Sequence, residues 1–262
     1  MSATVDPIFQ ISGVSLAFGG LKAVVDVNLD LPAGALQGVI GPNGAGKTTV
    51  FNLITGVYRP DCGQIHLAGK LLSKLPPWKI ARAGVARTFQ NIRLFGELTV
   101  LDNVRIGCHL RARHTMIQAM LRTPHHDRGE RRMKRRAMEI LSIMGLADRS
   151  GEYARNLPYG DQRRLEIARA IATDPRLLLL DEPAAGMNGA EKIQLAALIR
   201  DIRSRFDLTI LLIEHDMGLV MDLCERITVL DQGQVIARGA PAEIQNNPRV
   251  IEAYLGQPAS NA

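Results

Sequence analysis

The sequence has little cysteine and no long apolar run. Only three of its 262 residues are cysteine, and none has C-x-x-C spacing. It therefore suggests neither a disulfide framework nor a zinc site, and it predicts reduced, packed thiols. Its uncharged apolar runs, such as 177–180 and 208–213, are far shorter than the roughly 18 residues that a membrane-spanning helix needs. The first residues lack the basic start and apolar core of a signal peptide. We therefore expect a cytosolic chain unless another component brings it to a membrane.

Aromatic residues are also scarce, at 4% of the chain, and none lies in the most basic segment. The net charge is +6, but residues 105–136 hold ten basic and two acidic residues, so this segment alone carries +8. Binding of single-stranded nucleic acid usually combines basic with aromatic side chains, so we predict no nucleic-acid partner. Two interpretations of the segment remain, a solvated helical face or a surface that lies against anionic lipid. The lipid interpretation also uses the apolar side chains of Met116, Ile117, Met120 and Leu121.

The segment from Gly41 to Thr48 matches G-x-x-x-x-G-K-[ST] at every fixed position. It follows a predicted strand over 36–40 and precedes a predicted helix over 48–54. Glycines allow a tight turn that aims backbone N–H groups at phosphate oxygens, and the helix N-terminus adds partial positive charge. Lys47 would contact the β- and γ-phosphates, and the Thr48 hydroxyl would hold Mg²⁺. The sequence therefore predicts a nucleoside triphosphate site formed by Gly41, Pro42, Asn43, Gly44, Ala45, Gly46, Lys47, Thr48 and Thr49.

The rest of the chain predicts an α/β fold. Residues 8–31 form short alternating runs broken by glycine, which is typical of antiparallel strands. Residues 99–143 carry helical periodicity interrupted near 123–126, which predicts an insertion of two or three helices. After residue 160, helices and strands alternate, and this order predicts a parallel sheet covered on both faces. The elements expected there are helices over 162–172, 190–205 and 217–223 and strands over 177–180, 209–213, 227–230 and 235–237.

Polar residues follow two of these strands. Asp181 and Glu182 end the apolar run 177–180, at the strand end where ligands bind in parallel sheets. Asp181 can hold Mg²⁺ through water, and Glu182 can orient or deprotonate the water that attacks the γ-phosphate. His215 follows the run 210–213. Its position alone leaves open whether it contacts the γ-phosphate or is an exposed loop histidine.

Five motifs in a fixed order connect the chain to a known family. They are the phosphate loop, Gln90 after a strand, Leu-Pro-Tyr-Gly-Asp-Gln-Arg at 157–163, Leu-Leu-Leu-Leu-Asp-Glu-Pro at 177–183, and His215. With these motifs the chain resembles ATP-binding cassette (ABC) ATPases over nearly its whole length. The resemblance implies a P-loop NTPase of the ABC ATPase type, with a parallel core sheet, an antiparallel β subdomain and a helical subdomain.

The same resemblance implies a single domain over 1–262. Its catalytic lobe would span about 1–91 and 161–262, and its helical lobe about 92–160. In such a domain Phe18 would stack on adenine. Gln90 would touch Mg²⁺ and relay the nucleotide state to a membrane partner.

The remaining roles concern hydrolysis, and ATP and Mg²⁺ are the implied ligands. His215 would contact the γ-phosphate. Three residues would reach the γ-phosphate of the other subunit across a dimer, namely Tyr159, Gly160 and Asp161. The catalytic residues implied are Glu182, His215 and Lys47, and the Mg²⁺ ligands implied are Thr48, Gln90 and Asp181.

The sequence departs from the family pattern at two places. Where the family has Leu-Ser-Gly-Gly-Gln, Pro158, Tyr159 and Asp161 replace serine, the first glycine and glutamine. The serine hydroxyl is therefore missing, and proline has no N–H to offer. Asp161 can cap the following helix and favour its dipole. The second departure is Asn188, which stands at the usual aspartate of the loop that contacts the partner subunit.

These departures resemble one branch of the family, the LivG-type subunits of branched-chain amino-acid importers, as does the ending at 246–256. The resemblance implies an ATPase that powers import of branched-chain or other hydrophobic amino acids at the cytoplasmic face of a bacterial inner membrane. Its implied partners are a second ABC ATPase, identical or not, transmembrane permease subunits and, indirectly, a periplasmic binding protein. The alternatives are the ATPase of a lipopolysaccharide exporter, a nucleic-acid-associated ABC ATPase and a catalytically silent regulatory module. Intact Lys47, Asp181 and Glu182 argue against the silent module.

Overall fold

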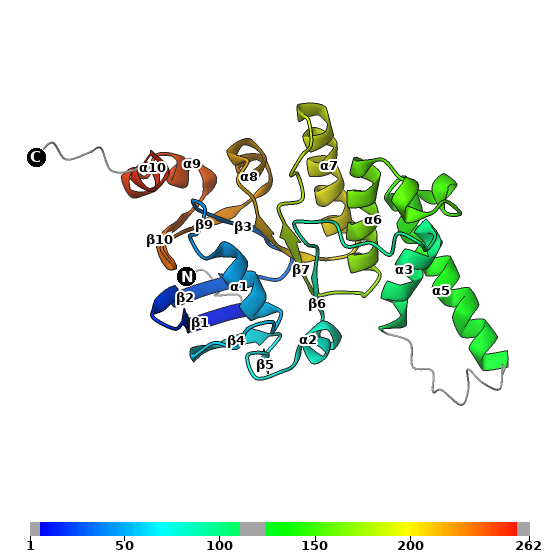
Figure 1. Cartoon of the computed structure of the whole chain (residues 1–262), viewed down its shortest axis with the longest axis horizontal. Coiled ribbons are helices and arrows are strands. Elements are labelled where there is room, and N and C mark those ends of the chain that lie inside the picture. Colours follow the sequence, from blue (N-terminus) through cyan, green and yellow to red (C-terminus); the bar gives the residue numbers. More distant parts are fainter. Residues whose placement is uncertain (1–5, 111–123, 256–262) are drawn as a thin grey trace, which may run out of the picture.

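The computed structural model describes residues 6–110 and 124–255, and these form two sheets flanked by helices (Figure 1). The larger sheet has six strands in the order β10-β9-β3-β8-β7-β6. Five of its strands run parallel, and β10 pairs antiparallel with β9. The parallel core sheet predicted from the sequence is therefore confirmed. The strands are β3 (Leu36–Ile40), β6 (Val85–Arg87), β7 (Leu177–Asp181), β8 (Thr209–Ile213), β9 (Arg226–Asp231) and β10 (Gln234–Gly239).

The central strands β3, β7 and β8 are buried at every position. Runs of this kind fit a parallel sheet whose two faces are both covered. In Figure 1, α7 (Gly189–Arg205) and α8 (Met217–Leu223) lie above this sheet, and α1 (Lys47–Ile54) lies below it. Alternate strand residues accordingly join two separate apolar clusters, one on each face.

The smaller sheet is antiparallel, as the sequence predicts, with the order β2-β1-β4-β5. The first of the short runs predicted over 8–31 merge into one strand over 9–18, with register irregularities that begin between Ile11 and Val14. This sheet packs with α1 in the second apolar cluster, so it places the end of β1 beside the phosphate loop. Its strands are β1 (Phe9–Phe18), β2 (Leu21–Leu31), β4 (Cys62–Leu67) and β5 (Lys70–Leu71).

Three helices pack together at the far end of the large sheet: α3 (Val100–His109), α5 (Pro124–Ile143) and α6 (Tyr159–Ile171). The predicted break near 123–126 is wrong for residues 124–126, because α5 includes them from Pro124 onward. A proline is well suited to the first position of a helix, where its missing N–H has no partner to lose. The four apolar residues of the lipid interpretation, at 116–121, lie outside the described residues.

Other helices also begin with proline and were missed from the sequence. They are α2 (Pro77–Ala83), α9 (Pro241–Gln245) and α10 (Pro248–Leu255). The signal was present, because proline is common in the first turn of helices. The cysteine prediction is wrong in one respect, since Cys62 is exposed while Cys108 and Cys224 are buried. In the described part of the chain, no helix combines the length and apolar character needed to cross a membrane.

Candidate functional site: a phosphate-loop pocket

The phosphate loop joins β3 to α1, as predicted. Gly41 has φ 150°, and a Cβ atom there would lie 2.0 Å from the carbonyl oxygen of Leu230. Gly46 has φ 101°, and its Cβ would lie 2.7 Å from the carbonyl oxygen of Ala23. Only glycine fits such positions, because any side chain would collide with neighbouring backbone. No side chain caps the N-terminus of α1 at Gly46, so this end of the helix is available to an anion.

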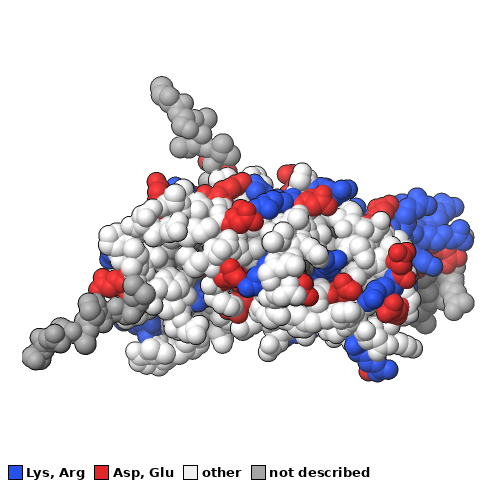
Figure 2. Space-filling view, turned by 90° about the horizontal axis from the view of Figure 1, so that it is seen from above, with Lys and Arg blue, Asp and Glu red and all other residues white. Residues whose placement is uncertain are grey.

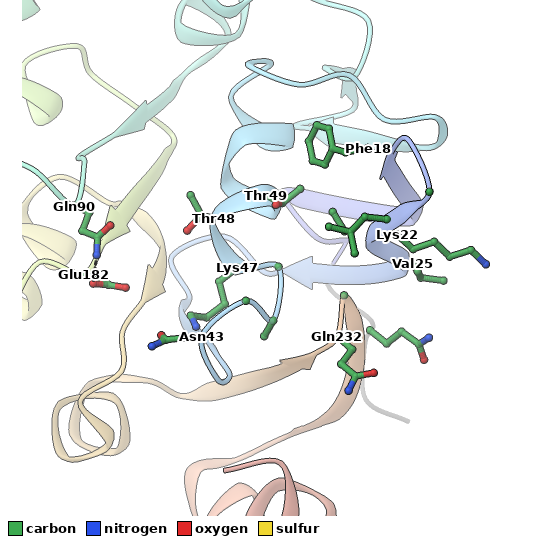
Figure 3. Close-up of a pocket in the computed structure, with 18 residues that line it drawn as sticks. Phe18, Lys22, Val25, Asn43, Lys47, Thr48, Thr49, Gln90, Glu182 and Gln232 are labelled. Atoms are coloured by element: carbon green, nitrogen blue, oxygen red, sulfur yellow. Dashed lines mark hydrogen bonds between the residues drawn. The ribbon is translucent and has the colours of Figure 1, made fainter. Parts of the chain in front are cut away.

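The loop forms one wall of a cavity of about 900 Å³ (Figure 3). Other walls come from the β1–β2 turn, from Gln90 and Glu182, and from the β9–β10 turn. The cavity thus brings together residues that the sequence assigned to adenine, phosphate and water. Its predicted lining residues are Phe18, Asn43, Gly44, Ala45, Gly46, Lys47, Thr48, Thr49, Gln90 and Glu182.

Lys47 is a buried cation, with 8% of its surface exposed. Its Nζ donates to the carbonyl oxygens of Gly41 at 2.6 Å and Pro42 at 2.9 Å. Burial lowers the pKa of Lys47, and the charges of Glu182 and Asp181 partly oppose this effect. Carbonyl oxygens carry only partial charge, so phosphate oxygens could replace them as stronger partners.

Asp181 ends β7 with 4% of its surface exposed, and its carboxylate is paired. Its Oδ2 accepts from Nη2 of Arg87 at 2.7 Å, and Nη1 of Arg87 donates to Asn52 on α1 at 2.7 Å. Arg87 therefore links β6, β7 and the phosphate-loop helix. Sequence reasoning missed it, because its only local signal was its place just before Thr88-Phe89-Gln90. Asp181 itself does not line the cavity.

Glu182, Gln90 and His215 meet beside the phosphate loop. Nε2 of Gln90 donates to Oε2 of Glu182 at 2.8 Å, and Nδ1 of His215 lies 3.7 Å from the same oxygen. Glu182 has φ 46°, a left-handed conformation that costs about 1–3 kcal/mol and persists mainly at functional sites. Its side chain is 19% exposed, whereas that of His215 is 63% exposed. Three segments far apart in sequence thus converge on one carboxylate.

Glu214 is a second carboxylate that sequence reasoning did not single out. Its Oε1 accepts from the backbone N–H of Ala184 at 2.8 Å, and its Oε2 from that of His215 at 3.2 Å. Burial raises the pKa of Glu214. The residue therefore ties the loop that follows Glu182 to the segment that carries His215.

Phe18 ends β1 on the side of the cavity away from Glu182 (Figure 3). Its ring is 45% exposed, and the ring of Tyr58 meets it edge-on at 5.1 Å between centroids. The exposed part of the ring is therefore available for stacking, and the contact with Tyr58 helps to hold it in place.

Tyr159, Gly160 and Asp161 form the first turn of α6 and do not line the cavity of their own chain. The predicted cap is wrong: Asp161 lies inside the helix, and its carboxylate pairs with Arg149 at 3.1 Å instead. The N-cap is Pro158, which has no hydroxyl or carboxylate to accept a bond. Asn188, at the family's usual aspartate, caps α7 by accepting from the N–H of Glu191 at 3.0 Å.

This arrangement of loop, lysine and carboxylates is that of a P-loop ATPase. A family model described as "ABC transporter" matches residues 24–185, and one described as "Branched-chain amino acid ATP-binding cassette transporter" matches residues 234–260. The chain therefore belongs to the ATP-binding cassette family of transporter ATPases. Proteins of this family bind and hydrolyse ATP, and they work with membrane-embedded transporter components.

Individual relatives agree with this assignment. The chain is 48% identical to the high-affinity branched-chain amino acid transport ATP-binding protein LivG of Escherichia coli (strain K12), over 96% of this chain and 98% of that protein. It is 35% identical to the lipopolysaccharide export system ATP-binding protein LptB of Acidithiobacillus ferridurans, over 89% and 90% of the two chains. The crystal structure of the ADP conformation of MJ1267, an ATP-binding cassette of an ABC transporter, superposes with a TM-score of 0.82 at 27% identity, covering 96% of this chain and 99% of that one.

Proposed function

We propose that this chain hydrolyses ATP to power an importer of branched-chain or other hydrophobic amino acids. The observation that supports ATP hydrolysis is that Lys47, Gln90 and Glu182 all line one cavity. The cargo rests on the relatives and on the model matched at 234–260. Lipopolysaccharide export is the second candidate function, because the exporter ATPase LptB is less similar to this chain, at 35% identity.

In this proposal each residue of the cavity has a defined task. The N–H groups of the phosphate loop and Lys47 bind the phosphates, and Phe18 stacks on adenine. Glu182 orients the attacking water and takes a proton on its carboxylate. Gln90 holds Glu182 in the arrangement seen here, and His215, mostly exposed beside it, reaches the γ-phosphate. Strain at Glu182 is consistent with a carboxylate held for catalysis.

The residues present fit a Mg²⁺ ion that is shared with the nucleotide. In the described residues no cluster of three His, Cys, Asp or Glu side chains could hold a metal alone. Mg²⁺ in such sites uses one or two protein ligands together with phosphates and water. The ligands would be the Thr48 hydroxyl, the Gln90 amide oxygen and, through water, the Asp181 carboxylate. The ion would neutralise charge that develops on the phosphates.

We infer that two cassettes, identical or not, form the working enzyme. Tyr159, Gly160 and Asp161 lie away from their own cavity, which suits contact with the γ-phosphate of a partner. Within each chain we propose a catalytic lobe over about 1–91 and 161–262 and a helical lobe over about 92–160. The boundary falls in the first turn of α6.

The permease subunits would contact a groove beside Gln90. A cavity of about 760 Å³ lies between α2 and β6 on one side and α3 and α6 on the other. Phe95, 49% exposed, and Ile106, 39% exposed, give it an apolar surface, and Arg93 and Arg169 add positive charge. Docking there would place the chain at the cytoplasmic face of a bacterial inner membrane. A periplasmic binding protein would act only through the permease.

The exposed basic face of α5 is a further candidate contact for anionic lipid. Figure 2 shows Lys and Arg side chains gathered at the end of the molecule where Figure 1 places α5. Each basic side chain near an anionic surface contributes about 1 kcal/mol, and salt weakens the effect. Replacing Arg131, Arg132, Arg135 and Arg136 by Gln should therefore reduce salt-sensitive binding to anionic vesicles without changing the ATPase rate.

A matched control separates this effect from net charge. It replaces four other exposed arginines by Gln, namely Arg200, Arg205, Arg226 and Arg249. Equal vesicle binding by the two variants would support the solvated-face interpretation. A larger loss of DNA binding than of lipid binding would favour the nucleic-acid alternative.

The variant Glu182→Gln tests hydrolysis. Loss of the general base should lower kcat by about 100-fold or more while ATP binding is retained, and the protein should accumulate as an ATP-bound dimer in gel filtration. Glu252→Gln, on the exposed face of α10, is the control. Near-normal turnover by Glu182→Gln would refute the assigned role.

A test of which cargo is transported needs the membrane partners. The chain would be purified with the membrane proteins that bind it and reconstituted in vesicles. ATP-dependent uptake of leucine, isoleucine or valine supports the proposal, whereas ATP-dependent extraction of lipopolysaccharide supports the exporter.

A further inference from the structure

Helix α6 carries a buried ion pair that faces the segment containing Gln90. Arg163 and Glu166 are one turn apart, with side chains 0% and 1% exposed, and Nη1 of Arg163 lies 2.9 Å from Oε2 of Glu166. The pair has no part in binding the phosphates, because neither residue lines the nucleotide cavity. A buried pair of this kind usually adds little stability, since desolvation offsets the attraction between the charges. Its contacts with the rest of the molecule are therefore the better guide to its role.

Those contacts are with main-chain atoms on both sides of Gln90. Arg163 donates to the carbonyl oxygens of Phe89 at 2.6 Å and Gln90 at 2.8 Å. Oε1 of Glu166 accepts from the N–H groups of Phe89 at 3.3 Å and Arg93 at 3.2 Å. Residues 89–95 form neither helix nor strand, so they belong to no ladder of backbone hydrogen bonds. The ion pair supplies the backbone partners that regular structure would otherwise provide.

The same pair reaches the first turn of α6 and the loop after Glu182. Nη2 of Arg163 also donates to the hydroxyl of Tyr159 at 3.2 Å. The Tyr159 ring packs on Gly186, where a Cβ atom would lie 3.6 Å from it. Gln90, held by Arg163 through its carbonyl oxygen, donates from its side chain to Glu182. The Arg163 guanidinium therefore connects the first turn of α6, which is expected to face a partner subunit, through Gln90 to Glu182, which is expected to activate water.

We propose that Arg163 and Glu166 are a positioning pair that fixes the Gln90 backbone to α6. The position of the first turn of α6 then determines whether the Gln90 side chain contacts Glu182. This inference rests on the proposed ATP hydrolysis at Glu182. It implies that the pair acts on turnover through Gln90 and leaves nucleotide binding to the phosphate loop. A displacement of this contact by about 1 Å can cost up to 100-fold in rate.

The test is a steady-state ATPase cycle on the full chain. Glu166→Gln should lower kcat about tenfold or more and leave the KM for ATP within about twofold. Arg164→Met is the matched control, because Arg164 lies on the same helix but bonds Gln194 at an exposed site, and it should behave as wild type. The same substitution at Glu166 is then made in a Gln90→Ala background, where it should have no further effect on kcat.

A second variant keeps the test decisive if Glu166→Gln is unstable. Arg163→Met combined with Glu166→Leu removes both charges together, so neither charge is left buried without its partner. This folded double variant should show the same loss of kcat. Two outcomes would overturn the positioning role. One is a wild-type kcat in the double variant, and the other is an equal loss of kcat from Glu166→Gln in the wild-type and Gln90→Ala backgrounds. Normal turnover in Glu182→Gln would instead show that the proposed hydrolytic role itself had failed.

Discussion

The ion pair at the edge of the sheet where β6 and β7 end is buried, whereas the ion pairs between helices α3 and α5 are partly exposed to solvent. At the sheet edge, Arg87 and Asp181 meet at 2.7 Å with side chains 7% and 5% exposed. Between the helices, Arg105 meets Asp102 at 2.8 Å and Glu130 at 2.7 Å, but these side chains are 27–39% exposed. The ion pairs at the two places have similar distances, but they differ in their exposure to solvent. Distance alone therefore does not tell how much the molecule depends on an ion pair.

The largest expected effect tests this difference directly. Arg87→Met should lower the free energy of unfolding by about 3–5 kcal/mol, because it leaves the buried Asp181 carboxylate without its partner. Arg105→Met should cost about 1 kcal/mol or less, because water replaces the lost contact. Urea unfolding followed by circular dichroism measures both. Equal losses from the two variants would contradict the importance assigned to burial.

Lys47 sharpens the comparison, because it is buried like Arg87 but is held by carbonyl oxygens. Lys47→Ala should weaken ATP binding by about 10–100-fold, the range for loss of a hydrogen bond from a charged group. A titration with a fluorescent ATP analogue measures the affinity, and the exposed Lys79→Ala serves as control. If both affinity and ATPase rate survive in Lys47→Ala, the phosphate-loop assignment is wrong.

Phe18 tests the exposed side of the same cavity. Phe18→Ala should weaken ATP binding by about tenfold, since stacking of a base on an aromatic ring is worth about 1–3 kcal/mol. Inorganic triphosphate should compete equally well in the variant and in wild type, because the phosphate loop is unchanged. A parallel loss of triphosphate binding would show that Phe18 acts through the loop instead.

The smallest effect concerns Glu214, a buried carboxylate that accepts from backbone N–H groups, whereas Asp181 pairs with Arg87. Burial raises its pKa, so the folded state holds the proton more tightly than the unfolded state. Stability from this group is therefore full at low pH and is lost as pH rises from about 4.3, the unfolded value, through the raised pKa. Glu214→Gln removes this dependence. The melting temperature of the variant relative to wild type should rise between pH 4 and pH 7, and a constant difference would contradict the prediction.

Much of the site was predictable where the signal is local. The phosphate loop, the strands that end at Asp181 and before His215, and the antiparallel start of the chain all follow from glycine spacing and apolar runs. Glu182, Gln90 and Phe18 all line the cavity. The end of an apolar strand indicated Glu182, whereas Gln90 and Phe18 came from the resemblance to the family. The predicted cap at Asp161 was wrong, because α6 begins two residues earlier, at Tyr159. A local pattern does not fix the first residue of a helix to within two positions.

The sequence by itself determined the family, the buried strands and the residue types that meet the phosphates, because neighbouring residues set backbone conformation and side-chain periodicity. Only the tertiary structure decided which charges neutralise one another. Arg87 meets Asp181 across 94 positions, and Arg163 holds Gln90 across 73. Such pairs depend on the order of strands in the sheet and on the packing of α6 against the segment after β6. The cost of leaving a buried charge unpaired selects them, and that cost arises only once the chain has folded around them.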